Sequence, residues 1–186
     1  MAWFRRRCSA AELPPAITVA CGLARGERVL AFGVDDNTGR YVVATTYALA
    51  VVTPAAETSA GVTSTAERAL RRPWLFVDAG AWEPETGTMT VTWTDGARGG
   101  QWSFRDQPTL LPETLRERVQ ASVVIGTRLV LGDRRSGRVA IRQDFETREL
   151  VPQTILGRYT RADDPEVKAH VEAALAHLSD QVGLPS

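Results

Sequence analysis

The sequence has little cysteine, lysine and histidine, and it has no long hydrophobic run. Cys8 and Cys21 are the only cysteines among 186 residues, and their spacing matches no zinc-binding pattern. Two cysteines are too few for a disulfide framework, so we expect free thiols in a reducing cytoplasm. No apolar stretch approaches the roughly eighteen residues of a membrane span. These absences argue against a disulfide-rich secreted domain and against an integral helical membrane protein.

The N-terminal stretch is basic but does not predict export. Arg5, Arg6 and Arg7 resemble the start of a signal peptide. The apolar stretch that should follow is broken by Glu12 and by the prolines at 14–15. We therefore expect a cytoplasmic protein in which residues 1–27 form a basic and partly helical lead-in.

Basic and acidic residues are equal in number. The chain has 22 basic and 22 acidic residues, so its formal net charge is zero. A general affinity for nucleic acid or for anionic membranes needs a basic excess or a basic patch. Lys168 is the only lysine. GC-rich coding is the simpler explanation for this bias toward arginine, and selection for bidentate anion binding is the alternative.

Residue patterns for catalysis, cofactor binding or metal binding are also missing. His170 and His177 lie seven residues apart on one predicted helix, which separates the two rings by roughly 10 Å. The glycine-rich segments 96–100 and 132–137 lie between predicted strands and lack the nucleotide-binding patterns. The acidic pairs at 35–36 and 163–164 indicate a turn and a helix cap. We predict no catalytic, cofactor-binding or metal-binding residues, and no cofactor.

The pattern that organises the chain is the alternation in residues 71–106. In Met89–Thr94 the apolar residues share one face and the threonines share the other, which is typical of a half-buried strand. Ala79-Gly80 predicts a sharp bend or a bulge. The stretch therefore predicts an antiparallel sheet with a buried aromatic face, and we expect Trp82, Trp93 and Trp102 in the core.

Strand patterns also precede this stretch, and a helix follows it. We predict a short helix from Pro14 to Leu23, a loop over 54–69 with a helical turn at 67–70, and a helix that begins at Pro112. That helix carries one apolar stripe, Leu111, Leu115 and Val119. The further predicted strands cover residues 29–34, 41–44, 49–52, 73–78 and 101–105.

A second group of strands ends in a second helix. Residues 123–131, 138–144 and 149–157 predict a three-strand meander. Asp164 followed by Pro165 predicts a helix start, and Gly183 predicts its end. The predicted fold class is α+β, with three parts: the lead-in at 1–27, a strand-rich unit closed by a helix at 28–122, and an appended meander with a C-terminal helix at 123–186.

Three local pieces of residues 28–121 resemble the bacterial pleckstrin-homology-like (PH-like) proteins. They are RVLAFG with DDNTGRYVVATTYALAVV, RRPWLFVDAGAWEPETGTMTVTWTDG, and the closing LPETLRERVQASVV. In the first piece a Thr, here Thr45 or Thr46, begins the turn before Leu49. Ala48 stands where the family often has a basic residue. The whole chain is similar to an uncharacterised actinobacterial group with this pattern, through WFRRR, LPPAI, GERVL and DDPEVKAHVEAALA.

The resemblance implies a PH-like antiparallel β-barrel closed by a helix. Such barrels bind peptides, proteins or lipids and rarely catalyse, so we expect a non-catalytic module that recognises a protein or peptide partner. Two alternatives stay open. One is an anionic lipid surface or nucleic acid, the latter less favoured, bound through arginine clusters; the other is an enzyme of unrecognised type. The candidate anion or partner surface consists of Arg71, Arg72, Arg134, Arg135 and Arg138.

Tryptophans near the arginines favour the alternative in which arginine clusters bind an anionic lipid surface or nucleic acid. Trp74 or Trp3 would supply cation–π contacts or base stacking beside such a cluster. Peripheral membrane contact is the form that lipid binding would take, since no transmembrane segment is predicted. If the tryptophans of the central sheet are core residues, specificity resides in the 54–69 loop, in the arginine-bearing turns or in the C-terminal unit.

Overall fold

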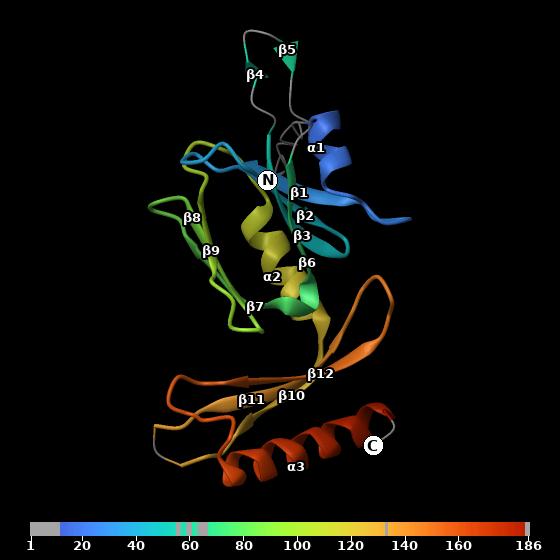
Figure 1. Ribbon diagram of the computed structural model, residues 1–186, viewed down its shortest axis with the longest axis vertical. Helices are drawn as coiled ribbons and strands as arrows, with labels where there is room; N and C mark the ends of the chain where they lie inside the picture. The colour runs from blue at the N-terminus through green and yellow to red at the C-terminus, as the bar shows by residue number, and fades with distance from the viewer. Residues whose placement is uncertain (1–11, 55–56, 59–60, 63–66, 133, 185–186) are drawn as a thin grey trace, which may run out of the picture.

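The computed structural model describes residues 12–54, 57–58, 61–62, 67–132 and 134–184 (Figure 1). The first unit begins with helix α1 (Pro15–Ala20) and a four-stranded antiparallel sheet. The strand order in this sheet is β1 (Val29–Val34), β2 (Tyr41–Thr45), β3 (Ala48–Thr53) and β6 (Glu67–Pro73). In the chain, β3 and β6 are separated by two short strands, β4 (Glu57–Thr58) and β5 (Gly61–Val62), which pair with each other in a separate small sheet. Residues 1–11, which include Trp3 and the arginines at 5–7, lie outside the described residues.

A second antiparallel sheet faces the first one. A 3-10 turn, η1 (Trp74–Phe76), leads into β7 (Val77–Glu83), which pairs with β8 (Thr88–Trp93), and β8 pairs with β9 (Gly100–Ser103). Helix α2 (Leu111–Ser122) then lies between the two sheets (Figure 1). The α+β class is confirmed. Among the described strands, no hydrogen-bonded ladder closes the two sheets into the predicted barrel.

The space between the sheets holds the main core. Trp74 is 1% exposed, and Trp93 and Trp102 are also buried there. The prediction for Trp93 and Trp102 is confirmed, whereas Trp82 is only partly buried against the same cluster. Trp74 donates its indole N–H to the Thr45 carbonyl at 2.9 Å. It is therefore a core residue, and the prediction that it adds surface stacking is wrong.

The C-terminal part is the predicted meander followed by the predicted helix, and both are confirmed. Strands β10 (Val123–Leu129), β11 (Gly137–Gln143) and β12 (Leu150–Leu156) form one antiparallel sheet. Helix α3 (Pro165–Val182) packs on one face of it through Val167 and Leu178. The Asp164 side chain caps the helix by accepting from the Glu166 N–H at 3.0 Å. The helix ends at Gly183 in the left-handed conformation, as predicted.

The two units contact each other through side chains of β11, β12 and the turn that joins them. Phe145 packs against the main core of the first unit, and Arg118 of α2 lies over its ring. Arg142 is 3% exposed and donates to the carbonyls of Leu75 and Val77 at 2.8 and 2.7 Å. Gln153 donates to the same Leu75 carbonyl at 3.0 Å. The boundary at residue 122 stays a prediction.

Two local predictions are wrong. Residues 67–70 belong to strand β6 and not to a helical turn, because pairing with β3 places Leu70 opposite Val51. Residues 73–78 are not one strand. A 3-10 turn there buries both Trp74 and Leu75, which an extended strand would point to opposite faces. Of the predicted 54–69 loop, residues 55–56, 59–60 and 63–66 lie outside the described residues.

Candidate functional site

Strand β7 has a free edge that lines a groove. Within the described sheets its only neighbour is β8. Ala79, Gly80, Ala81 and Trp82 are consecutive, and all four line one hollow of about 310 Å³. Side chains of consecutive strand residues point to opposite faces, so a hollow that all four touch runs along the edge of the strand. The β7 backbone is therefore accessible from this hollow.

The sequence of β7 explains why its edge is open. Ala79, Gly80 and Ala81 are exposed and carry small or no side chains, so little covers the main chain. The register shifts between Val77 and Ala79, so a bulge is present at Asp78, one residue before the predicted Ala79-Gly80. Bulges bend a strand and interrupt its pairing. A Cβ built on Gly80 would lie 2.1 Å from Leu115 Cδ2, so glycine allows α2 to pack this close to β7.

Helix α2 forms the opposite wall of the hollow. Pro112, Leu115 and Val119 give that wall an apolar surface. Arg116 and Gln120 are exposed and lie on its rim. The hollow thus offers an accessible strand edge, an apolar wall and one positive charge.

A second hollow of about 490 Å³ continues the first one toward the C-terminal unit. Both hollows share Ala79, Val119 and Gln120, so they form one continuous groove, which we call the β7–α2 groove. The second part is bounded by the face of the C-terminal sheet that α3 does not cover. The residues of that sheet in the groove include Val123, Gly126, Arg128, Arg138, Ala140 and Ile155.

The β7–α2 groove is positively charged although the whole chain is neutral. Arg116, Arg128, Arg138 and Arg142 line it, and among the described residues Asp78 is the only acidic one that does so. Arg142 is buried, and desolvation lowers its pKa to about 10, so it stays charged near neutral pH. Arg138 forms an ion pair with Asp78. Neither Arg116 nor Arg128 forms an ion pair with a described residue.

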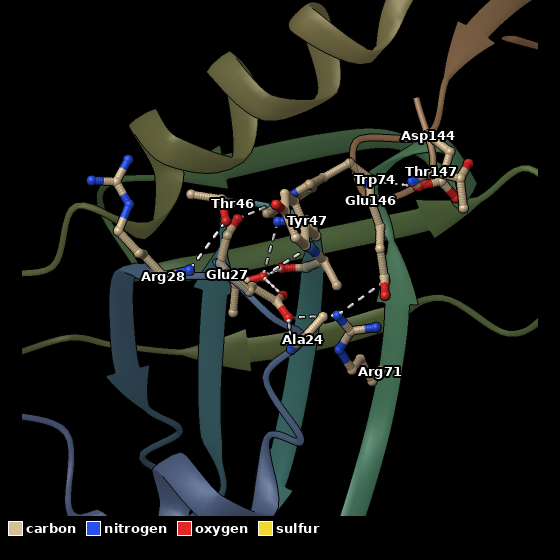
Figure 2. Close-up of polar contacts among 12 residues, drawn as sticks. Ala24, Glu27, Arg28, Thr46, Tyr47, Arg71, Trp74, Asp144, Glu146 and Thr147 are labelled. Atoms are coloured by element: carbon tan, nitrogen blue, oxygen red, sulfur yellow. Dashed lines mark hydrogen bonds and ion pairs between the residues drawn. The ribbon is translucent and has the colours of Figure 1, made fainter. Parts of the chain in front are cut away.

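The five arginines predicted as a surface do not gather in one place. Arg71 lies on β6, where it pairs with Glu27 at 2.7 Å and with Glu146 at 3.7 Å, as Figure 2 shows. Glu27 is fully buried and also accepts from the Ala24 N–H at 2.7 Å and from the Thr45 hydroxyl. This network joins the lead-in, the first sheet and the β11–β12 turn. It is a structural link between segments.

The other predicted arginines have separate partners. Arg72 pairs with Asp95 at 2.7 Å and lies 4.7 Å from the centroid of the Trp93 ring. Arg135 pairs with Glu166 at 2.8 Å at the start of α3, and Arg134 is exposed in the same turn with a positive φ of 62°. Four of the five are therefore paired with carboxylates, and only Arg138 lies in the β7–α2 groove.

The residues with the strongest potential for chemistry lie apart from one another. Cys21 is buried, and burial, followed by the nearby Glu27, raises the pKa of its thiol to about 11. His170 contacts the Glu166 carbonyl oxygen and His177 contacts Gln181, each within one turn of α3. Over the described part of the chain, no three His, Cys, Asp or Glu side chains gather as metal ligands would.

Sequence reasoning did not identify the main parts of the groove. Arg116 looked like one residue of a polar helix face, and Arg128 lies in an apolar strand. The available signal was Ala79-Gly80-Ala81, three small residues inside a strand. Such a stretch marks a place where another backbone can approach closely.

Comparison with known proteins found no matching family model, no matching curated protein and no matching solved structure. None of the helices in the described ranges has both the length and the apolar character to cross a membrane.

Proposed function

We propose that this protein is a non-catalytic binding module that takes up an extended peptide or protein segment as an added strand on β7. The observation that carries the proposal is the free edge of β7, which lines the groove with four consecutive residues. A strand edge offers unpaired N–H and C=O groups, and an extended peptide can pair with them as an extra strand.

The walls of the groove fit such a ligand. Alternate side chains of an added strand point to opposite sides. One set would meet the apolar wall formed by Leu115 and Val119. Because Ala79 and Ala81 are small, large ligand side chains fit beside them. Main-chain pairing would supply affinity, and the apolar wall would supply part of the specificity.

The arrangement of the first unit also supports a PH-like assignment as part of the proposal. A four-stranded sheet, a three-stranded sheet and a helix follow one another in the chain, and the helix lies between the sheets. This is the order that the resemblance of residues 28–121 implies. A cytoplasmic location, expected from the few cysteines and the interrupted N-terminal apolar stretch, is also part of the proposal.

The test uses phage-displayed random short peptides as the probe. The library is selected on the wild-type protein and screened against Ala81→Trp, which fills the groove from an exposed position, and against Ala173→Trp, a matched change on the exposed face of α3. We expect enriched peptides that lose at least about tenfold in affinity on Ala81→Trp and nothing on Ala173→Trp. Equal binding to both variants, or no enrichment on the wild type, contradicts the proposal.

A further inference from the structure

We infer that the segment bound in the β7–α2 groove is acidic, and that its carboxylates are held by Arg116 and by the cross-strand pair Arg128 and Arg138. This inference rests on the proposed function and adds the chemical class of the partner. It is carried by the distribution of charge in the groove, where four arginines and one aspartate line the walls of a chain with no net charge.

The pair Arg128 and Arg138 is the strongest indication that the bound segment is acidic. The two residues are directly opposite each other in the β10–β11 ladder, and both are exposed on the groove face. Like charges directly opposite in a sheet repel each other and lower stability. Asp78 is bonded to Arg138, whereas Arg128 forms no ion pair with a described residue. A carboxylate bound between the two arginines would remove the repulsion.

The third arginine lies at the other part of the groove. Arg116 projects from α2 beside Ala79–Trp82, where a strand added to β7 would lie. It is exposed and forms no ion pair in the described chain. A segment that follows β7 and continues along the C-terminal sheet would therefore pass Arg116 and then the Arg128–Arg138 pair.

The C-terminal unit supplies most of the positive charge that an acidic segment would meet in the groove. The first unit contributes Asp78 and Arg116 to the groove, so its own charges balance. The excess positive charge comes from β10 and β11 of the appended unit, through Arg128, Arg138 and Arg142. Contacts of buried Arg142 hold that sheet against the first unit. The appended unit thus converts a general strand site into one that selects acidic segments.

The rest of the lining favours a peptide over a nucleic acid. Val119, Val123 and Ile155 make the remaining surface largely apolar, and Trp82 is the one aromatic residue among the described residues that line the groove, so these residues form no series of aromatic side chains on which successive bases would stack. A strand edge pairs with the regularly spaced N–H and C=O groups of a peptide backbone, and a nucleic acid has no such backbone groups. The acidic groups are therefore expected to be Asp and Glu side chains of a polypeptide.

The test measures the affinity of peptides selected as above by fluorescence anisotropy. Each peptide is compared with a version in which every Asp and Glu is replaced by Asn and Gln. A single-stranded oligothymidylate is the nucleic-acid probe. The variants are Arg116→Gln and Arg128→Gln, and Arg25→Gln is the control, since Arg25 is exposed on the turn before β1 and outside the groove. None of these residues is buried, so all variants should fold.

We expect the selected peptides to be acidic and their amide versions to bind more weakly. We also expect about threefold to fivefold weaker binding for each groove variant, no change for Arg25→Gln, and weaker binding at higher salt. Arg128→Gln should leave the melting temperature of the free protein unchanged or raised. Selected peptides without Asp or Glu that still depend on Ala81 would overturn the inference and leave the proposed function intact. Oligothymidylate that displaces the peptide and depends on Arg128 would also overturn it.

Discussion

Nη1 of Arg142 donates a hydrogen bond of 2.7 Å to the carbonyl oxygen of Val77, the first residue of β7. The same atom donates to the Leu75 carbonyl at 2.8 Å. A buried guanidinium of the C-terminal sheet thus holds the chain just before the free edge of β7. This contact fixes the C-terminal sheet relative to β7.

Replacing Arg142 tests whether this contact holds the two units together. In Arg142→Met the Val77 carbonyl loses its Arg142 donor, which costs about 1–3 kcal/mol for a buried group left unsatisfied, and the Leu75 carbonyl keeps only its bond from Gln153. Removal of the desolvated charge offsets part of that cost. We expect the free energy of unfolding to fall by about 2 kcal/mol, measured by urea denaturation. Arg128→Met, on the same face but exposed, is the control, and an unchanged midpoint for Arg142→Met would show that the contact is not stabilising.

Thr45, rather than Thr46, organises the turn between β2 and β3. Its hydroxyl accepts from the Ala48 N–H at 2.8 Å and contacts the Ala48 carbonyl at 2.9 Å, besides Glu27. Thr45→Val keeps the shape and removes these bonds from a fully buried position, so we expect a loss of about 2 kcal/mol. Thr46→Val, which removes one bond from the Arg28 N–H, should cost about 0.5–1 kcal/mol. Equal losses in urea denaturation would contradict this difference.

Cys21 predicts a pH dependence of stability. Burial raises the pKa of its thiol from 9.0 to about 11, so the folded state binds this proton more tightly than the unfolded state does. The resulting stabilisation is complete below pH 9.0 and is lost as the pH rises to about 11. In a Cys8→Ser background we expect the urea midpoint to fall over this range, and Cys21→Ala to remove part of the fall. Parallel curves for the two proteins would show that Cys21 does not titrate this way.

Gly80 is predicted to set how closely α2 approaches β7. A Cβ at this position meets Leu115 Cδ2 at 2.1 Å, so Gly80→Ala forces Leu115 to move and should cost about 1–3 kcal/mol. Leu115→Ala alone leaves a cavity and should cost about 2–4 kcal/mol. The double variant should be more stable than the sum of the two losses by about 1 kcal/mol, because the clash disappears. Simple additivity in a double-mutant cycle would contradict direct contact.

Much of the fold could be predicted because local patterns and tertiary packing agree. Strand β1 follows from an apolar run that ends at a turn, and Asp35 closes that turn, since its backbone carbonyl accepts from the Gly39 N–H at 2.8 Å. The start of α3 follows from Asp164 and its end from Gly183. In each case the conformation at the boundary favours few residue types: an acceptor side chain such as that of Asp at the helix start, and glycine where φ is positive at the helix end.

The failures come from elements that depend on distant partners. The β6 sequence ERALRRP has no alternation and contains good helix formers, and its strand conformation depends on pairing with β3. The candidate site fails for the same reason. Arg128 and Arg138 are opposite each other only because of the register of β10 and β11, and a shift of one residue would separate them. The sequence shows both arginines but does not show this register.

Amide hydrogen exchange of β7, measured with and without a selected peptide, tests the central claim most directly. A free strand edge exposes the N–H groups of alternate residues, and an added strand would bond them. The account predicts that bound peptide slows exchange at alternate residues within Ala79–Glu83, while exchange in α3 stays the same. Slower exchange elsewhere in the protein, with β7 unchanged, would contradict strand addition at this edge.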